Sequence, residues 1–286
     1  MKIAVLLNGS GKHLDITSHL FGYWNELYEN VTFDFYLATW VDDVDYSQYS
    51  WIKSYVRLKE ESCPYDLSEH PEGMHQPHYS YTLYKANQLR KESGIKYDGV
   101  LQTRTDTYIF RELLDLLTSL YTVKQGINQD VSNSQVSSRI MYSGFGNELL
   151  NGRFWTSDYF FFGHPDAFDK FSNMFIDVWI KNELPDNTKL MHIMQAEYLH
   201  HVGIYNSSIS NYPNHALQNV LIREPHRFGH HSTHTDAGWD RMHPSPFQLK
   251  TLIAQNGPKH LLTKDIAPKV IIYFESTDKE NKYKVL

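Results

Sequence analysis

The chain has 286 residues, of which 41% are hydrophobic and 21% charged, a composition typical of a globular enzyme with a buried core. Acidic residues outnumber Lys plus Arg by 33 to 27 and no basic run occurs, which argues against a nucleic-acid partner. One cysteine excludes an intramolecular disulfide and no segment reaches the roughly 20 apolar residues of a membrane span, so we expect a cytoplasmic protein without a transmembrane segment.

The first half of the chain alternates short apolar runs with amphipathic stretches. The predicted strands, apolar or alternating runs, are 2–7, 31–40 and 98–103. The predicted helices, with apolar residues at helical spacing, are 19–28, 79–91 and 113–120. This alternation predicts an α/β fold with a mostly parallel sheet and helices on both faces. Such sheets bind ligands outside the carboxyl ends of their strands.

The second half is less regular. Residues 123–150 are polar without a clear period and predict a mobile loop, and residues 154–163 predict one aromatic strand. Helices are predicted from Pro165 onward and over 189–202. A His-rich irregular stretch follows at 211–246, and the last predicted strand is 270–274. No repeat and no linker interrupts the chain, so we expect a single domain over 1–286.

Small and polar residues follow the first strand, where an α/β sheet receives a nucleotide. Asn8, Gly9 and Lys12 are candidate donor-binding residues, because Gly9 allows close approach of the backbone to a ligand. The turn has neither the P-loop spacing nor the Rossmann fingerprint. Trp40, at the end of the second strand, offers a flat face for stacking on a base. An ordinary turn and a core edge are the alternatives at these positions.

Asp106 lies just beyond the third predicted strand and is a candidate metal ligand. Mn²⁺ and Mg²⁺ bind carboxylate oxygens and keep coordination positions open for phosphate oxygens. Arg104, two residues earlier, points to the same side of an extended chain and pairs either with Asp106 or with a phosphate. An internal salt bridge between Arg104 and Asp106 is the alternative.

Several segments resemble, in the same order, motifs of one family. Residues 97–106 resemble the YD-x-V-(hydrophobic)-R-x-R-x-D stretch of WavE-like and related polysaccharide-biosynthesis glycosyltransferases, which stands in the place of the Asp-x-Asp motif of GT-A enzymes. Gln102 stands where these proteins often have their first Arg, and Arg104 stands where the common pair has its first Asp. The other segments similar to this family are 34–42, 79–86, 157–163 and 196–204.

The resemblance implies a single GT-A-like domain, with 1–122 as its nucleotide-binding half. The acceptor-side half, 123–286, would carry the mobile loop and the His-rich segment. It also implies a metal-assisted transfer, with Mn or Mg, of a sugar from a nucleotide-sugar donor to a saccharide acceptor in polysaccharide biosynthesis.

The resemblance also suggests roles for individual residues. Asp106 and His226 would bind the metal, and Asp158 and Glu197 would be the catalytic carboxylates, one acting as general base. A His-rich surface loop is the alternative for His226. A strand-entry turn is the alternative for Asp158, and a solvated helix position is the alternative for Glu197.

Two other functions fit parts of the pattern. A nucleotidyltransferase shares a related sheet but would carry a Gly-rich basic loop after its first strand, where Lys12 is the one basic residue. A catalytically inactive protein of the same fold that binds carbohydrate or nucleotide is favoured by the missing second acidic ligand. The sequence leaves both alternatives open.

Overall fold

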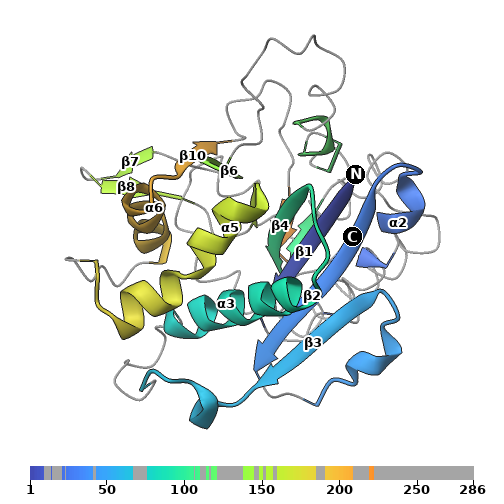
Figure 1. Ribbon diagram of the computed structural model, residues 1–286, viewed down its shortest axis with the longest axis horizontal. Coiled ribbons are helices and arrows are strands. Elements are labelled where there is room, and N and C mark those ends of the chain that lie inside the picture. Colours follow the sequence, from blue (N-terminus) through green and yellow to red (C-terminus); the bar gives the residue numbers. More distant parts are fainter. Residues whose placement is uncertain are drawn as a thin grey trace, which may run out of the picture.

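The computed structural model describes the following residues: 1–9, 14, 21–22, 24–40, 43–66, 76–105, 107–109, 114–115, 117–120, 138–144, 148–150, 153–156, 160–184, 191–208 and 219–221. Within these ranges the main element is a seven-stranded sheet with the order β10-β6-β9-β4-β1-β2-β3 (Figure 1). Two small two-stranded sheets pair β11 with β5 and β7 with β8.

Four parallel strands form one side of the main sheet: β1 (Lys2–Asn8), β2 (Thr32–Trp40), β3 (Ile52–Leu58) and β4 (Gly99–Arg104). β1 lies between β2 and β4, and all of its residues from Ile3 to Asn8 are buried. Such a continuous buried run requires cover on both faces of the sheet. The predicted strands 2–7, 31–40 and 98–103 are confirmed as β1, β2 and β4.

The other side of the sheet contains one reversed strand. β9 (Phe160–Gly163) runs antiparallel both to β4 and to β6 (Ile140–Ser143), and β10 (Tyr205–Ser208) is parallel to β6. Because β9 is reversed, its first residue, Phe160, pairs with Thr103 near the carboxyl end of β4. The mixed, mostly parallel sheet predicted from the sequence is confirmed.

Helices cover both faces of this sheet. One face packs against α3 (Gln76–Glu92), α5 (Pro165–Ser172), a π-helical turn (Phe175–Ile180) and α6 (Met191–His201). The opposite face packs against α2 (Trp24–Leu27) and against helical residues that include Leu114 and Leu117. A hydrophobic cluster lies on each face of the sheet. The side chains of β1 belong alternately to the two clusters, because successive residues of a strand point to opposite faces. Among the described helices, none combines the length and the apolarity that a membrane span requires.

The structure differs from the sequence predictions at several strands. β3 was not predicted, because its exposed residues, Lys53, Tyr55 and Arg57, give this edge strand a polar sequence. The polar stretch 123–150 contains β6 and β7 (Glu148–Leu150), so the loop prediction is wrong for these residues. The single strand predicted over 154–163 is two, β8 (Arg153–Trp155) and β9, while β5 (Thr107–Ile109) and β11 (Asn219–Leu221) form a further pair.

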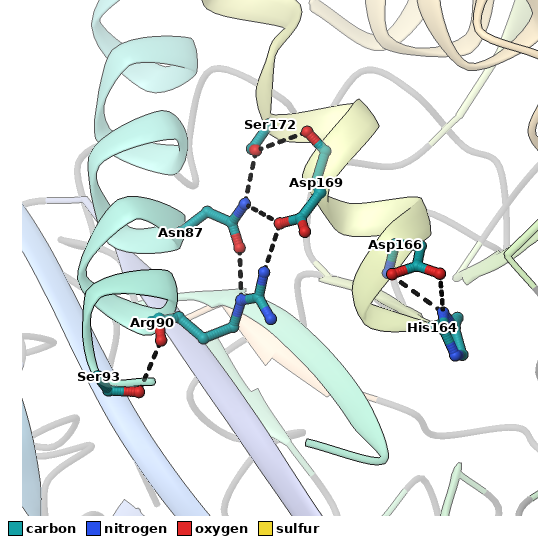
Figure 2. A network of polar contacts seen from close by, with 7 residues as sticks. All are labelled: Asn87, Arg90, Ser93, His164, Asp166, Asp169 and Ser172. Carbon is teal, nitrogen blue, oxygen red and sulfur yellow. Dashed lines mark hydrogen bonds and ion pairs between the residues drawn. The ribbon is translucent and has the colours of Figure 1, made fainter. Parts of the chain in front are cut away.

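A polar network joins α3 to α5 (Figure 2). The Arg90 guanidinium is paired with the Asp169 carboxylate, and its Nε donates to Asn87 Oδ1 at 2.7 Å. Asn87 Nδ2 donates in turn to Asp169 Oδ1 at 2.9 Å and to Ser172 Oγ at 2.8 Å. α5 follows Gly163, which pairs with Val100 at the start of β4, so α5 begins near the amino ends of the parallel strands.

Candidate nucleotide site at the carboxyl edge of the sheet

Three predicted donor-binding residues end neighbouring parallel strands at one edge of the sheet. Asn8 is the last residue of β1 and pairs with Arg104, the last residue of β4. On its other side Asn8 pairs with Ala38, two residues before Trp40 at the end of β2. Side chains of opposed residues share a face, as do residues two apart along a strand. Asn8, Arg104 and Trp40 therefore all belong to the face that α3 covers.

A buried amide pair lies beneath this edge. Gln102 Nε2 donates to Asn8 Oδ1 at 2.7 Å, and both side chains are buried. Among the described residues, neither Asn8 Nδ2 nor Gln102 Oε1 has a hydrogen-bond partner. Gln102 was not predicted as a functional residue, although a Gln inside an otherwise apolar strand is the signal that identifies it.

The end of β1 lies against the residue that precedes Asp106. Thr105 N donates to the backbone oxygen of Asn8 at 3.2 Å, and Thr105 is buried. Gly9 has a φ of +128°, and a Cβ added to it would lie 2.9 Å from Thr105 Oγ1. Only glycine allows this backbone conformation together with this close approach.

Replacing Gly9 by Ala is expected to lower the free energy of unfolding by about 1–3 kcal/mol, because it adds backbone strain and a steric clash. Denaturant titration measures the change. Gly94→Ala is the matched control: Gly94 has a φ of +65° and nothing within 4 Å of an added Cβ, so the variant adds strain alone. Thr105→Ala should recover part of the loss in the Gly9→Ala background but not in the Gly94→Ala background. Equal losses in the two glycine variants would contradict the assigned contact.

Aromatic side chains flank Trp40. Its ring lies 4.8 Å from the His78 ring and 5.9 Å from the Tyr81 ring, both in α3. His78 Nε2 lies 3.8 Å from the exposed Glu60 carboxylate. His78 is not predicted from the sequence, because its position in α3 beside Trp40 at the end of β2 is apparent only in three dimensions.

A second polar cluster lies on the far side of β9. Asn206 Nδ2 donates to Thr156 Oγ1 at 2.7 Å, Ser143 Oγ donates to Asn206 Oδ1 at 3.0 Å, and the two hydroxyl oxygens lie 2.9 Å apart. Since Ser143 uses its single proton on Asn206, Thr156 donates to Ser143 and closes the ring. All three residues are buried. Asn206 therefore offers no exposed amide, although Asn206-Ser207-Ser208 has the sequence of a glycosylation acceptor.

The β8–β9 connection, which carries Asp158, is anchored by described residues at both ends. Thr156 N donates to His192 O in α6 at 3.1 Å, and Thr156 O lies 2.9 Å from His192 Nδ1. Phe160 begins β9 at the carboxyl edge. Glu197 is partly buried in α6, which packs against β8 and β10, so it lies apart from the β1–β4 edge.

Some residues of the family-like segments have a role in holding strands together. Asp34 Oδ2 accepts from Tyr97 Oη at 2.7 Å and from Lys53 Nζ at 2.9 Å. The Tyr97 and Tyr36 hydroxyls are 2.6 Å apart, and burial together with these hydrogen bonds raises the pKa of Tyr97 well above its usual range. Asp98 Oδ2 accepts from Lys2 N at 2.7 Å. These acidic residues fix β1, β2 and β3 relative to the start of β4.

Comparison with known proteins gives no family assignment. No protein-family model matches the chain, and no curated protein matches it. A solved structure of the galactosyltransferase LgtC, in complex with donor and acceptor sugar analogues, is similar at 10% identity and a TM-score of 0.41, covering 100% of this chain and 98% of that one. A glycosyltransferase involved in glycosylation of the major capsid of PBCV-1 is similar at 16% identity and a TM-score of 0.40, covering 80% and 100%. Likeness at these values does not assign a function.

Four of the predicted site residues lie outside the described residues: Lys12, Asp106, Asp158 and His226. Both predicted metal ligands are among them. Within the described ranges, no three His, Cys, Asp or Glu side chains come together as a metal site. The structure therefore brings together Asn8, Gly9, Trp40 and Arg104, and it describes Glu197 at another place in the fold.

Proposed function

We propose that the chain is a glycosyltransferase that moves a sugar from a nucleoside-diphosphate sugar to a saccharide acceptor, with the help of Mn²⁺ or Mg²⁺. The observation that carries this proposal is the convergence of Asn8, Trp40 and Arg104, from three neighbouring parallel strands, on one face at one edge. This edge is where α/β sheets bind nucleotides. The sheet geometry supports a nucleotide site, and the family resemblance of the sequence supports sugar transfer.

The donor-binding residues have complementary chemistry. The Arg104 guanidinium is suited to pair with diphosphate oxygens, and the Asn8 amide to donate to an oxygen of the nucleotide. Gly9 permits the backbone to approach the ligand, and Trp40 supplies an aromatic face for the base. Lys12, four residues after Asn8, would add a second positive charge. Together these groups orient the donor and balance the charge of the departing diphosphate.

The metal is part of the proposal, with Asp106 and His226 as its ligands. Thr105 and Thr107, on either side of Asp106, are both fully or almost fully buried next to the end of β4. A carboxylate oxygen and an imidazole nitrogen form a donor set that suits Mn²⁺. When bound, the ion would offset negative charge on the leaving diphosphate.

The acceptor is assigned to the side of the sheet beyond β4, next to Asp158 and Glu197. Asp158 lies in sequence between Thr156 and Phe160, and Phe160 begins β9 at the carboxyl edge. A carboxylate there would take the proton from the acceptor hydroxyl as the diphosphate leaves. We place this reaction in polysaccharide biosynthesis in the cytoplasm, carried out by a single domain over 1–286.

A screen of UDP- and GDP-sugars, followed by calorimetric titration of UDP and GDP with and without Mn²⁺, tests the proposal. Hydrolysis or transfer of one donor, together with nucleotide binding that Mn²⁺ strengthens, is the expected result. Nucleotide or sugar binding without turnover would instead identify an inactive binding protein. Turnover of a nucleoside triphosphate with a sugar phosphate would identify a nucleotidyltransferase. Binding of neither diphosphate would remove the proposal.

A further inference from the structure

Each side chain of the Asn8–Gln102 amide pair keeps one buried polar atom that the fold leaves without a partner among the described residues. Asn8 is 1% exposed and Gln102 is 0% exposed, and one hydrogen bond, from Gln102 Nε2 to Asn8 Oδ1, joins them. Among the described residues, Asn8 Nδ2 remains a donor without an acceptor. Burial of an unsatisfied donor costs free energy, so such a group calls for a partner that a ligand supplies.

The hydrogen bond from Gln102 determines which end of the Asn8 amide is available. An Asn side chain carries an acceptor and a donor that exchange places when the amide turns over. While Gln102 Nε2 donates to Oδ1, the NH₂ group is the part of the Asn8 amide that remains for a ligand, and Gln102 Oε1 is left without a partner among the described residues. Gln102 and Asn8 share the face of the sheet that also carries Arg104, so the donor is directed to the side where we place the diphosphate.

We propose that Gln102 is a positioning residue that fixes the hydrogen-bonding polarity of Asn8, so that Asn8 Nδ2 donates to an acceptor oxygen of the bound nucleoside diphosphate. This inference rests on the proposed function, since the nucleotide is its ligand. Gln102 does not touch the ligand itself. It acts by keeping the Asn8 carbonyl away from the phosphate and ribose oxygens, which would repel it.

Gln102→Glu is the decisive variant, because a carboxylate at this position reverses the polarity. An ionised Glu accepts from Asn8 Nδ2, turns the amide over and presents Oδ1 to the nucleotide. We expect the affinity for UDP or GDP, whichever the wild type binds more tightly, to fall roughly 10- to 100-fold at the alkaline end of a pH series, where the introduced carboxyl is ionised. The lost affinity should return as the pH falls, because a protonated carboxyl again donates to Oδ1.

Three further variants separate positioning from structural damage. Gln102→Met removes both polar atoms at similar volume, and it should weaken binding by less than Gln102→Glu, with the pH dependence of the wild type. Asn8→Asp keeps an acceptor for Gln102 but replaces the donor by a charge, and it should lose at least as much affinity as Gln102→Glu. Gln88→Glu introduces the same charge in α3, next to Lys85 Nζ, which lies 3.0 Å from Gln88 Oε1, and it should bind like the wild type.

Calorimetric titrations of the full chain with UDP and GDP in the presence of Mn²⁺, each normalised to the wild type at the same pH, give the readout. Thermal unfolding of each variant confirms that it is folded. Recovery at low pH in Gln102→Glu, with no recovery in Gln102→Met, supports the inference. A flat pH profile in folded Gln102→Glu, or unchanged affinity in Asn8→Asp, would overturn it while leaving the proposed function in place. If the wild type binds neither diphosphate, both the proposed function and this inference fail.

Discussion

Replacing Asp106 by Ala is expected to reduce sugar transfer by about 10²–10³-fold or more, while the free energy of unfolding changes by less than about 0.5 kcal/mol. Loss of the carboxylate removes the proposed ligand of an ion that would stabilise the leaving diphosphate. The effect should therefore appear mainly in kcat and in the strengthening of nucleotide binding by Mn²⁺. Steady-state kinetics with the donor found in the screen, calorimetry and denaturant titration measure the three quantities.

The alternative role of Asp106, a salt bridge with Arg104, predicts a different outcome. In that case Asp106→Ala and Arg104→Met should each lower stability, and the double variant should be less destabilised than the sum of the two. Asp106→Asn is the matched control, because it keeps the shape of the side chain and removes its charge. Full activity in Asp106→Ala would remove the metal role altogether.

Replacing Asp169 by Ala is expected to lower the free energy of unfolding by about 3 kcal/mol. Arg90 is 5% exposed, so without its carboxylate partner the guanidinium becomes a buried charge without compensation. Asn87 Nδ2 loses one of its two acceptors in the same step (Figure 2). Chemical denaturation with intrinsic Trp fluorescence measures the change.

Removal of the other partner should cost less. In Arg90→Met the remaining Asp169 side chain is 35% exposed, so water can solvate its carboxylate. The Met side chain also keeps much of the packing of the Arg stem. We expect a loss of about 1–2 kcal/mol and a double variant that is more stable than additivity predicts. Strict additivity would contradict the network. Nucleotide affinity should be unchanged in all three variants.

Much of the parallel half of the sheet was predictable because its strands and helices have strong local patterns. β1 is a continuous apolar run, and α3 has Tyr79, Leu83 and Ala86 at helical spacing. β6 and β10, by contrast, have only four residues each, and their place in the sheet depends on pairing between distant segments. Hydrophobic periodicity does not contain that information.

One boundary was predicted incorrectly for a physical reason. The run 154–163 is rich in aromatic residues and predicts one strand. At Thr156 the backbone binds His192 of α6 instead of a neighbouring strand, so the ladder stops and β9 begins only at Phe160. A local pattern cannot show that a helix far along the chain offers this alternative partner.

The candidate site was predictable where it follows from strand ends. Asn8, Trp40 and Arg104 were identified because ligands bind beyond the carboxyl ends of parallel strands, and the structure places all three there. The sequence shows Gln102 only as a departure from a family motif. Its contact with Asn8 is not predicted, because the two residues are distant in sequence. The metal, the single domain and the roles of Asp158 and Glu197 stay predictions.

Because β9 is reversed, the residues assigned to the donor and the segment assigned to the acceptor lie at opposite ends of their strands in the sequence. The residues proposed to bind the donor, Asn8, Trp40 and Arg104, end their strands, whereas the segment proposed for the acceptor precedes one, between Thr156 and Phe160. Both flanks of that segment are held in place, one by hydrogen bonds to Ser143, Asn206 and α6, the other by the ladders of β9 with β4 and β6. Insertion or substitution of residues between Thr156 and Phe160 would leave the pairing register of β1 and β4 unchanged. The architecture thus permits acceptor preference to diverge in evolution, or by loop grafting, at a constant choice of donor.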